Sequence, residues 1–161
     1  KWVSLLNYRF PRTKGPFLDY GAGSGSFLNI LHKQGWNDLW GYDPDKKPFV
    51  CDDEIVHRIY EEDIFPLKKR LKKNFKYIMT HHSIEHIADP LPIMKLWYQA
   101  LQKNGELILA TPNVNSLSFK IFKGFWYFLT PPHHYIIYSP KALQISLEKI
   151  GFKINSIEYH S

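Results

Sequence analysis

The sequence predicts an α/β fold whose mostly parallel, doubly wound sheet has helices on both faces. Short apolar segments alternate along the chain with segments whose apolar residues recur at helical spacing. The first apolar segment runs directly into a glycine-rich turn at residues 21–25, as the first strand of such folds does before its helix. Ser–Pro and Asp–Pro pairs then mark the starts of later helices. Together these patterns are typical of strands that alternate with crossover helices.

Six short apolar segments are predicted to be strands. They are expected at residues 16–20, 39–42, 55–59, 75–80, 106–110 and 152–159. The first runs into the glycine-rich turn, and the second ends at Asp43. The stretch before the third contains Pro48, which would break a helix, so only a stunted helix is expected there.

Three longer segments are predicted to be helices, because each carries apolar residues on one face between a start signal and a stop signal. They begin after residue 25, at Asp89-Pro90 and at Ser139-Pro140, and they end at Gly35, at Asn104-Gly105 and at Gly151. Aspartate or serine caps the first free amides, and proline fits the first helical position because its missing N–H is not needed there. Glycine adopts the left-handed conformation that commonly ends a helix.

Length and composition indicate a single domain over residues 1–161. A chain of this length fits one core, and the sequence contains no internal repeat or linker-like tract. It has no apolar run long enough for a transmembrane helix. The single cysteine excludes an internal disulfide and favours a reducing, cytoplasmic setting.

The formal net charge is +6, and a large part of the excess lies in one run, Lys68–Lys76. Such a run usually covers a solvated helix face, and the alternative is a patch that contacts phosphate or an anionic surface. No nucleic-acid-binding motif accompanies it. We therefore expect no nucleic-acid partner, with contact to an anionic surface as the alternative.

The glycine-rich turn is the expected ligand site, because ligands of open α/β sheets bind at the carboxyl ends of the strands. Gly21, Gly23 and Gly25 allow the backbone to turn sharply and to approach a ligand closely. Asp43, at the end of the next strand, can accept hydrogen bonds from both ribose hydroxyls of an adenosine. These two features predict an adenosine-containing cofactor, but they do not say which one.

The alternating glycines differ from the G-x-G-x-x-G fingerprint of dinucleotide-binding folds. Together with four later segments they resemble class I S-adenosylmethionine-dependent methyltransferases, in the subgroup of ubiquinone-biosynthesis and sugar or natural-product O-methyltransferases. The segments are residues 19–25, 41–44, 62–64, 80–90 and 111–113. We expect two departures from that family's pattern in the given sequence, a missing seventh strand and an N-terminal cap reduced to residues 1–15, as truncation at both ends would produce.

The resemblance implies S-adenosylmethionine as the cofactor and assigns the residues that hold it. These are Asp19, Tyr20, Gly21, Ala22, Gly23, Asp43, Pro44, Asp63, Ile64 and His81. In the family pattern Asp19 and the backbone of the turn hold the methionine end, Asp43 the ribose, and Asp63 with Ile64 the adenine. His81 would line the sulfonium side. The alternative for Asp19 and Asp43 is a structural role in tying down their own turns.

The expected reaction is methyl transfer to a small-molecule acceptor, at oxygen, by in-line displacement at the sulfonium. Such a reaction needs positioning and, for some acceptors, a general base, but no covalent intermediate. The candidate catalytic bases are His81, His82, His133 and His134. Two alternative functions are a non-catalytic cofactor-binding or scaffolding domain and a nicotinamide-dependent reductase. The glycine spacing and the lack of a Tyr-x-x-x-Lys pair disfavour the reductase.

His82, Glu85 and His86 are spaced so that they would share one face if their segment were helical. Histidine and carboxylate side chains so arranged can bind a metal. The alternative is that Glu85 and His86 bond to the backbone of their own turn. We expect no metal, and catalysis that is independent of divalent ions.

Residues 117–138 are rich in aromatic side chains and contain few charges. Three interpretations stay open for this segment: an element packed on the core, a lid over the acceptor, or a patch that touches membranes through aromatics flanked by Lys120 and Lys123. In the lid interpretation, His133 and His134 follow the rigid Pro131-Pro132 pair and reach an acceptor hydroxyl.

Overall fold

The computed structural model describes residues 14–44, 56–59, 75–129 and 133–159. The chain divides into two compact units, which are described separately. The first comprises residues 1–80 and 99–109, and the second comprises residues 81–98 and 110–161. None of the helices in the described ranges is long and apolar enough to cross a membrane.

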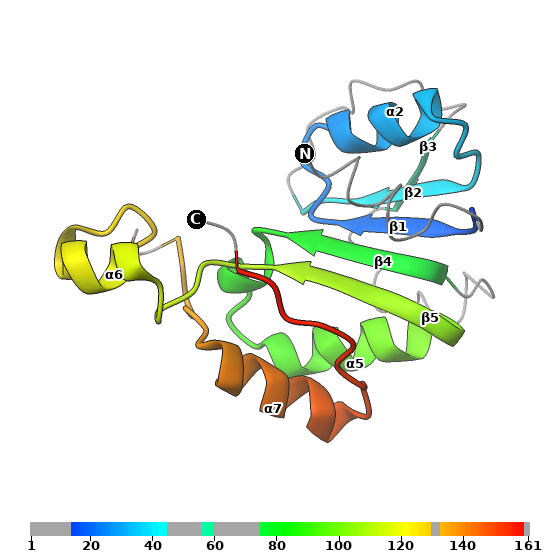
Figure 1. Ribbon diagram of the computed structural model, residues 1–161. Coiled ribbons are helices and arrows are strands. Elements are labelled where there is room, and N and C mark those ends of the chain that lie inside the picture. Colours follow the sequence, from blue (N-terminus) through cyan, green and yellow to red (C-terminus); the bar gives the residue numbers. More distant parts are fainter. Residues whose placement is uncertain (1–13, 45–55, 60–74, 130–132, 160–161) are drawn as a thin grey trace. The chain divides into compact units, whose positions relative to one another are not determined.

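The first unit contains the sheet (Figure 1). Its strands are β1 (Phe17–Tyr20), β2 (Leu39–Tyr42), β3 (Val56–Ile59), β4 (Phe75–His81) and β5 (Leu101–Ala110). They are hydrogen-bonded in the order β3-β2-β1-β4-β5, and the β1–β2, β1–β4 and β2–β3 pairs are parallel. From β1 the chain adds strands on one side and then returns to the other, so the strand order reverses at β1. The predicted fold class is confirmed.

Helix α2 (Ser26–Lys33) covers one face of this sheet with its apolar side. Leu28 and Leu31 are fully buried against Phe17 and Leu39, and Trp36 closes the same core. The helix ends as predicted, because Gly35 adopts a φ of 79° that side chains disfavour. This packing fixes the strand-to-helix turn at the carboxyl end of β1.

The second unit is mainly helical. Its elements are η1 (Ile84–His86), α5 (Pro90–Ala100, of which the last two residues belong to the first unit), α6 (Leu117–Phe122), η2 (Lys123–Phe125) and α7 (Pro140–Ile150). The predicted start of α7 is confirmed, since the Ser139 hydroxyl accepts a hydrogen bond from the Ala142 amide at 3.2 Å. Its predicted end is confirmed as well, because Gly151 has a φ of 117°.

Two predicted elements differ from the structure. Residues 152–159 form no strand: only Phe152 and Ile154 are half-buried, and no strand pairs with this segment in the part of the chain that is described. A strand needs a neighbour for its backbone groups, and apolar alternation alone does not supply one. Helix α5 ends at Ala100 rather than near Asn104, because β5 begins at Leu101 and joins the sheet beside β4.

Candidate functional site

The glycine-rich turn of the first unit folds onto the end of β2. The amides of Gly21 and Ala22 both donate to the Tyr42 carbonyl, at 2.8 and 2.9 Å, and the Gly25 amide donates to the Ala22 carbonyl at 2.9 Å. Gly21, Gly23 and Gly25 have φ values of 88°, 55° and 74°. These conformations strain other residues, so the three glycines are required for the turn itself.

Asp43 reaches back to this turn. The Gly23 amide donates to Asp43 Oδ2 at 2.6 Å, so the two features predicted to share one site are in contact. A Cβ atom placed on Gly23 would meet no atom of the described residues within 4 Å, so these residues leave that side of the turn open. A half-buried carboxylate next to an open turn is suited to accept hydrogen bonds from ligand hydroxyls.

Asp19 lies in β1, one residue before the strand ends at the glycine-rich turn, and is buried, with 5% of its surface exposed. Burial, together with the negative charge of Asp43, raises the pKa of Asp19 to about 7. A carboxyl group of this kind is near half-ionised at neutral pH, and a nearby cation would stabilise its ionised form. A ligand that brings a positive group close to Asp19 would therefore find a partner there.

The Asp19→Asn variant is expected to change how stability depends on pH. The folded-state pKa of about 7 lies above the ordinary value of 3.8. Between these values the folded chain holds a proton that the unfolded chain has lost, so the Asp19 contribution is full at low pH and is lost as pH rises toward 7. Asparagine mimics the neutral acid, so the variant should gain free energy of unfolding over the wild type near pH 8 and little near pH 4. Urea unfolding of both proteins across this pH range checks the prediction. A difference in free energy of unfolding between variant and wild type that stays the same at every pH would contradict it.

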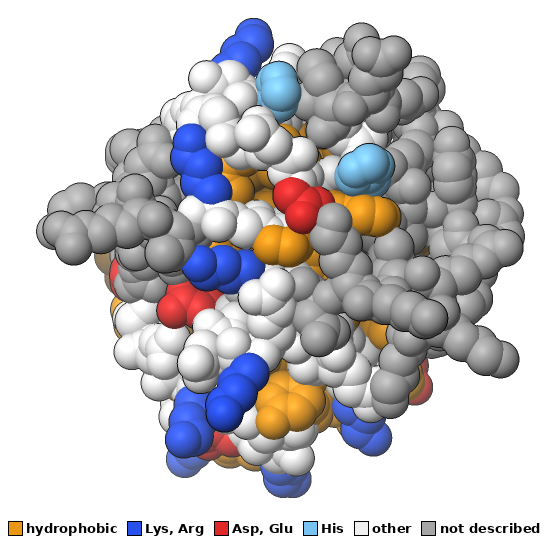
Figure 2. All heavy atoms as spheres, turned by 90° about the vertical axis from the view of Figure 1, so that its right-hand side faces the viewer, with side chains coloured by type: hydrophobic (Ala, Val, Ile, Leu, Met, Phe, Trp, Pro, Cys, Tyr) orange, Lys and Arg blue, Asp and Glu red, His pale blue; other side chains and the backbone are white. Residues whose placement is uncertain are grey.

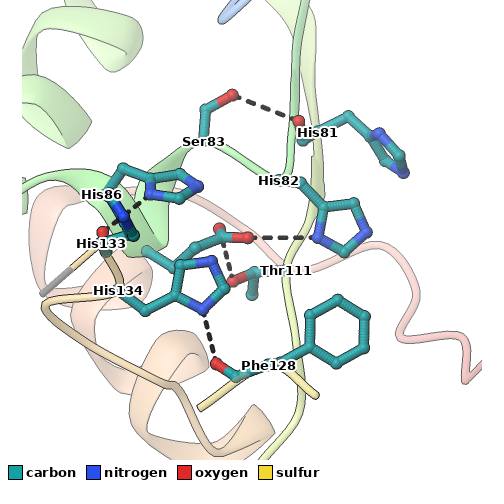
Figure 3. Close-up of polar contacts among 9 residues, drawn as sticks. His81, His82, Ser83, His86, Thr111, Phe128, His133 and His134 are labelled. Atoms are coloured by element: carbon teal, nitrogen blue, oxygen red, sulfur yellow. Dashed lines mark hydrogen bonds and ion pairs between the residues drawn. The ribbon is translucent and has the colours of Figure 1, made fainter. Parts of the chain in front are cut away.

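Glu85 is the centre of a polar cluster in the second unit (Figure 3). Its side chain is fully buried, at 0% exposure. His82 Nδ1 donates to Glu85 Oε1 at 3.1 Å, and the Thr111 hydroxyl donates to Oε2 at 3.0 Å. Burial by itself would raise the pKa of Glu85, but the hydrogen bonds from His82, its own backbone and Thr111, with the His82 charge, lower it overall. Glu85 is therefore an ionised carboxylate.

The predicted histidines are divided among different environments in this unit. His86 Nδ1 donates to the His133 carbonyl at 2.8 Å, and His134 Nδ1 donates to the Phe128 carbonyl at 2.6 Å. The His82 ring stacks on Phe128 with centroids 5.7 Å apart. Burial, and then the neighbouring His82, lower the pKa of His81, so its imidazole is neutral at physiological pH and able to accept a proton.

The predicted metal-binding group was His82, Glu85 and His86, but the structure groups His134 with Glu85 and His86. The three-residue helix η1 is too short for the helical spacing that would place His82 on the same face, and His82 has a φ of 53° before it. The contribution of Thr111 to the cluster was not predicted. Two signals pointed to Thr111: it belongs to the 111–113 segment of the family resemblance, and it comes directly after the fifth strand, where side chains commonly meet a site.

Much of the aromatic segment is exposed. Phe125 is 95% and Tyr127 is 83% exposed, and Phe122 also faces solvent. Trp126 is buried and anchors the segment, with its indole N–H donating to the Ser118 hydroxyl at 3.0 Å and its ring 5.2 Å from Phe119. The interpretation as an element packed on the core therefore does not hold for the exposed side chains.

Several predicted residues lie outside the described ranges. These are Asp63, Ile64, Lys68 to Lys73, Pro131, Pro132 and most of residues 1–15. On the face drawn in Figure 2, the lysine and arginine side chains of the described residues are interspersed with acidic and hydrophobic side chains. Both interpretations of the Lys68–Lys76 run, a solvated helix face and the alternative of contact with an anionic surface, stay predictions.

Comparison with known proteins identifies the class. The sequence profile described as "Methyltransferase domain" matches residues 1–157. A solved S-adenosylmethionine-dependent methyltransferase from Archaeoglobus fulgidus is 26% identical, with a TM-score of 0.72 over 93% of this chain and 67% of that one. An S-adenosylmethionine-dependent methyltransferase from Mesorhizobium loti has a TM-score of 0.70 at 15% identity, over 96% of this chain and 82% of that one, and shows the same fold.

A tRNA U34 carboxymethyltransferase from Glaesserella parasuis is 27% identical over 160 residues, which cover 95% of this chain and 50% of that protein. The counterpart from Pasteurella multocida matches equally well. The chain thus spans about half the length of these relatives.

The comparisons confirm the methyltransferase class and S-adenosylmethionine as its cofactor. They do not reach the narrower O-methyltransferase subgroup, which stays a prediction. The predicted partners were wrong: we expected a small-molecule acceptor and no nucleic acid, whereas these relatives are named for action on a tRNA. The lack of a recognisable nucleic-acid-binding motif does not exclude an RNA partner, because RNA recognition often depends on shape and stacking instead.

Proposed function

Because the chain belongs to the methyltransferase domain family, we propose that it transfers a methyl group from S-adenosylmethionine to RNA, with tRNA as the first class of acceptor to test. The observation that carries this proposal is the match of nearly the whole chain to transferases named for tRNA U34. An RNA acceptor agrees with the cytoplasmic setting that the single cysteine favours. We also retain residues 1–161 as a single methyltransferase domain.

The proposed cofactor site is the turn of the first unit. Asp43 accepts hydrogen bonds from the ribose, and the backbone of residues 20–23 meets the methionine end. Asp19 faces the positively charged amine, which stabilises its ionised form. Pro44 follows Asp43 at the strand end and is exposed. Asp63 and Ile64 are retained as the proposed adenine contacts on the basis of their sequence motif.

Methyl transfer at a sulfonium is an in-line displacement, so the protein mainly aligns donor and acceptor. Alignment of this kind supplies on the order of 7–11 kcal/mol of the barrier. Among the four predicted bases we favour His81, because it is the last residue of β4 and ligands of such sheets bind at the carboxyl ends of the strands. Burial lowers the pKa of His81, so its imidazole is neutral and can take the proton that an acceptor loses. His82 and His134 each donate a hydrogen bond through Nδ1, which fixes the orientation of the ring. Oxygen as the methylated atom stays a prediction.

The exposed aromatic side chains supply a surface suited to RNA. Phe122, Phe125 and Tyr127 are solvent-exposed, with Lys120 and Lys123 in the same short segment. Unstacked bases bind to aromatic faces at about 1–3 kcal/mol each, and lysines neutralise the adjoining phosphates. Trp126 holds these side chains on a fixed support through its bond to Ser118.

The direct test incubates the chain with methyl-labelled S-adenosylmethionine and total tRNA, followed by digestion and mass spectrometry of the nucleosides. We expect label in a modified uridine of the tRNA and none in a DNA duplex of matched length. The nucleoside mass identifies the added group as methyl, because a carboxymethyl group would need a carboxylated donor that this incubation does not contain. Bound cofactor with no transfer to any RNA, under conditions where label reaches a non-nucleic-acid acceptor, would contradict the proposal.

Replacing both Phe125 and Tyr127 by alanine should weaken tRNA binding by about tenfold or more, since each base stack is worth about 1–3 kcal/mol. Fluorescence anisotropy with labelled tRNA measures this. Affinity for S-adenosylmethionine should not change. Tyr159→Ala is the matched control, because Tyr159 is also exposed but lies outside the segment. Equal tRNA affinity for the double variant and the wild type, with loss of binding to anionic vesicles instead, would assign the surface to membranes.

A further inference from the structure

Three potential ligand groups from separate parts of the second unit converge at one point. A Glu85 carboxylate oxygen, a His86 ring nitrogen and a His134 ring nitrogen all lie within 4.8 Å of one another. Figure 3 shows the His86 and His134 imidazoles side by side. We propose that Glu85, His86 and His134 form a binding site for one divalent transition-metal ion of the zinc type.

The hydrogen bonds of the two histidines determine which ring nitrogen can bind a metal. Each Nδ1 faces a backbone carbonyl, that of His133 for His86 and that of Phe128 for His134, and a carbonyl only accepts. Both Nδ1 atoms therefore carry the proton, and both Nε2 atoms present a lone pair. Metal-binding histidines characteristically have this arrangement, in which a backbone oxygen fixes the tautomer and orientation of the ring.

Glu85 is oriented in the same way. His82 and Thr111 each donate to one of its carboxylate oxygens, which leaves further lone pairs on both oxygens. The backbone carbonyl of Glu85 also accepts from the amides of Tyr135 and Ile136, at 2.8 and 3.3 Å. This last contact ties η1 to the segment that carries His134, so ligands 48 and 49 residues apart in sequence are held together before any ion binds.

The electrostatics favour a cation. Two imidazole lone pairs and an ionised carboxylate are three acceptors at close range, and they repel one another unless a proton or a metal ion lies between them. The His86 and His134 ring centroids are 4.6 Å apart at an interplanar angle of 67°. Ligands on a four-coordinate zinc stand about 3.4 Å apart for bonds of about 2.1 Å, so modest rotations of the two less buried histidine side chains complete the site.

The donor set indicates the kind of ion. Two nitrogens and one carboxylate suit zinc and similar first-row ions, whereas magnesium prefers oxygen ligands only. The cluster found among the described residues has three members, which is the number seen in sites that keep a position for water or a substrate oxygen. His86 is exposed, so such a position is reachable from solvent. This proposal departs from the expectation of a metal-independent protein.

The test uses the whole chain, stripped with a chelator, and titrates Zn²⁺ by calorimetry, with Mg²⁺ as the comparison. We expect one Zn²⁺ per chain and Mg²⁺ binding weaker by at least about a hundredfold. The His86→Ala and His134→Ala variants should each lose at least about tenfold in Zn²⁺ affinity. His133→Ala is the matched control, because only its backbone carbonyl takes part, and it should bind like the wild type.

Two further measurements keep the result independent of methyl transfer. Substitution with Co²⁺ should give a visible absorption spectrum typical of nitrogen and oxygen ligands, and that spectrum should be absent from the His86→Ala, His134→Ala double variant. Circular dichroism verifies that each variant is folded. If the wild type and a folded double variant bind Zn²⁺ with equal affinity, the proposed metal site is wrong. The cluster of Glu85, His86 and His134 would then hold a shared proton and no metal ion.

Discussion

Replacing Asp43 by alanine is expected to weaken S-adenosylmethionine binding by tenfold or more. In the proposed site this carboxylate accepts hydrogen bonds from both ribose hydroxyls, and hydrogen bonds to a charged group are worth about 1.5–3 kcal/mol each. Part of that energy is offset, because in the free chain Asp43 already accepts from the Gly23 amide at 2.6 Å. The loss should therefore be smaller than the sum of two such bonds but still large.

Calorimetric titration with S-adenosylmethionine measures the Asp43→Ala effect directly. Asp38→Ala is the control, since Asp38 lies just before β2, at the opposite end from Asp43, and bonds to Trp40. Removing the Asp43 charge should also lower the pKa of Asp19, because that charge is one of the causes that raise it. Cofactor affinity that does not change in Asp43→Ala would refute the ribose assignment.

The Trp36→Ala variant should lose about 3–5 kcal/mol of unfolding free energy, the largest stability effect that we predict. Trp36 is 1% exposed, and its ring lies edge-on to Phe17 at 5.6 Å and to Tyr77 at 5.8 Å. The indole thus joins the end of α2 to β1 and β4. Alanine would leave a cavity under the helix that follows the glycine turn, and the surrounding aromatic rings could fill it only in part.

Guanidinium unfolding of the Trp36→Ala and Trp36→Phe variants measures the loss of unfolding free energy in each. The comparison separates the effect of a cavity from the effect of any substitution at this position. Phenylalanine keeps most of the ring contacts, so its loss should be less than half that of alanine. Ile30→Ala, on the solvent side of α2, should change stability by less than about 1 kcal/mol. A Trp36→Ala loss no larger than that of Ile30→Ala would show that α2 is not held to the sheet through Trp36.

The glycine turn and the strand ends could be predicted from the sequence because each has a local cause. Only glycine adopts the φ values found at residues 21, 23 and 25 without strain, and a short apolar run that ends in such a turn is a strand. The cap of α7 was predictable for the same reason, since Ser139 bonds within its own first turn. The place of Asp43 near the glycine turn could be predicted because Asp43 directly follows the end of β2.

Features that depend on distant partners could not be predicted in this way. Whether residues 152–159 form a strand depends on a neighbouring strand, and the apolar pattern of the segment does not contain that information. The approach of His134 to Glu85 depends on backbone bonds between η1 and residues 135–136, which no local pattern announces. The raised pKa of Asp19 likewise arises from burial and from the charge of Asp43, twenty-four residues away in sequence.

The central claim, that the cofactor binds at the glycine turn, is tested most directly by hydrogen exchange. Exchange at the amides is measured by mass spectrometry for the chain alone and with saturating S-adenosylhomocysteine, the demethylated product. We expect slower exchange in peptides that contain residues 17–25 and 39–44, and no such change with NAD. Bound S-adenosylhomocysteine that leaves exchange in both peptides unchanged, or protection by NAD in its place, would contradict the account.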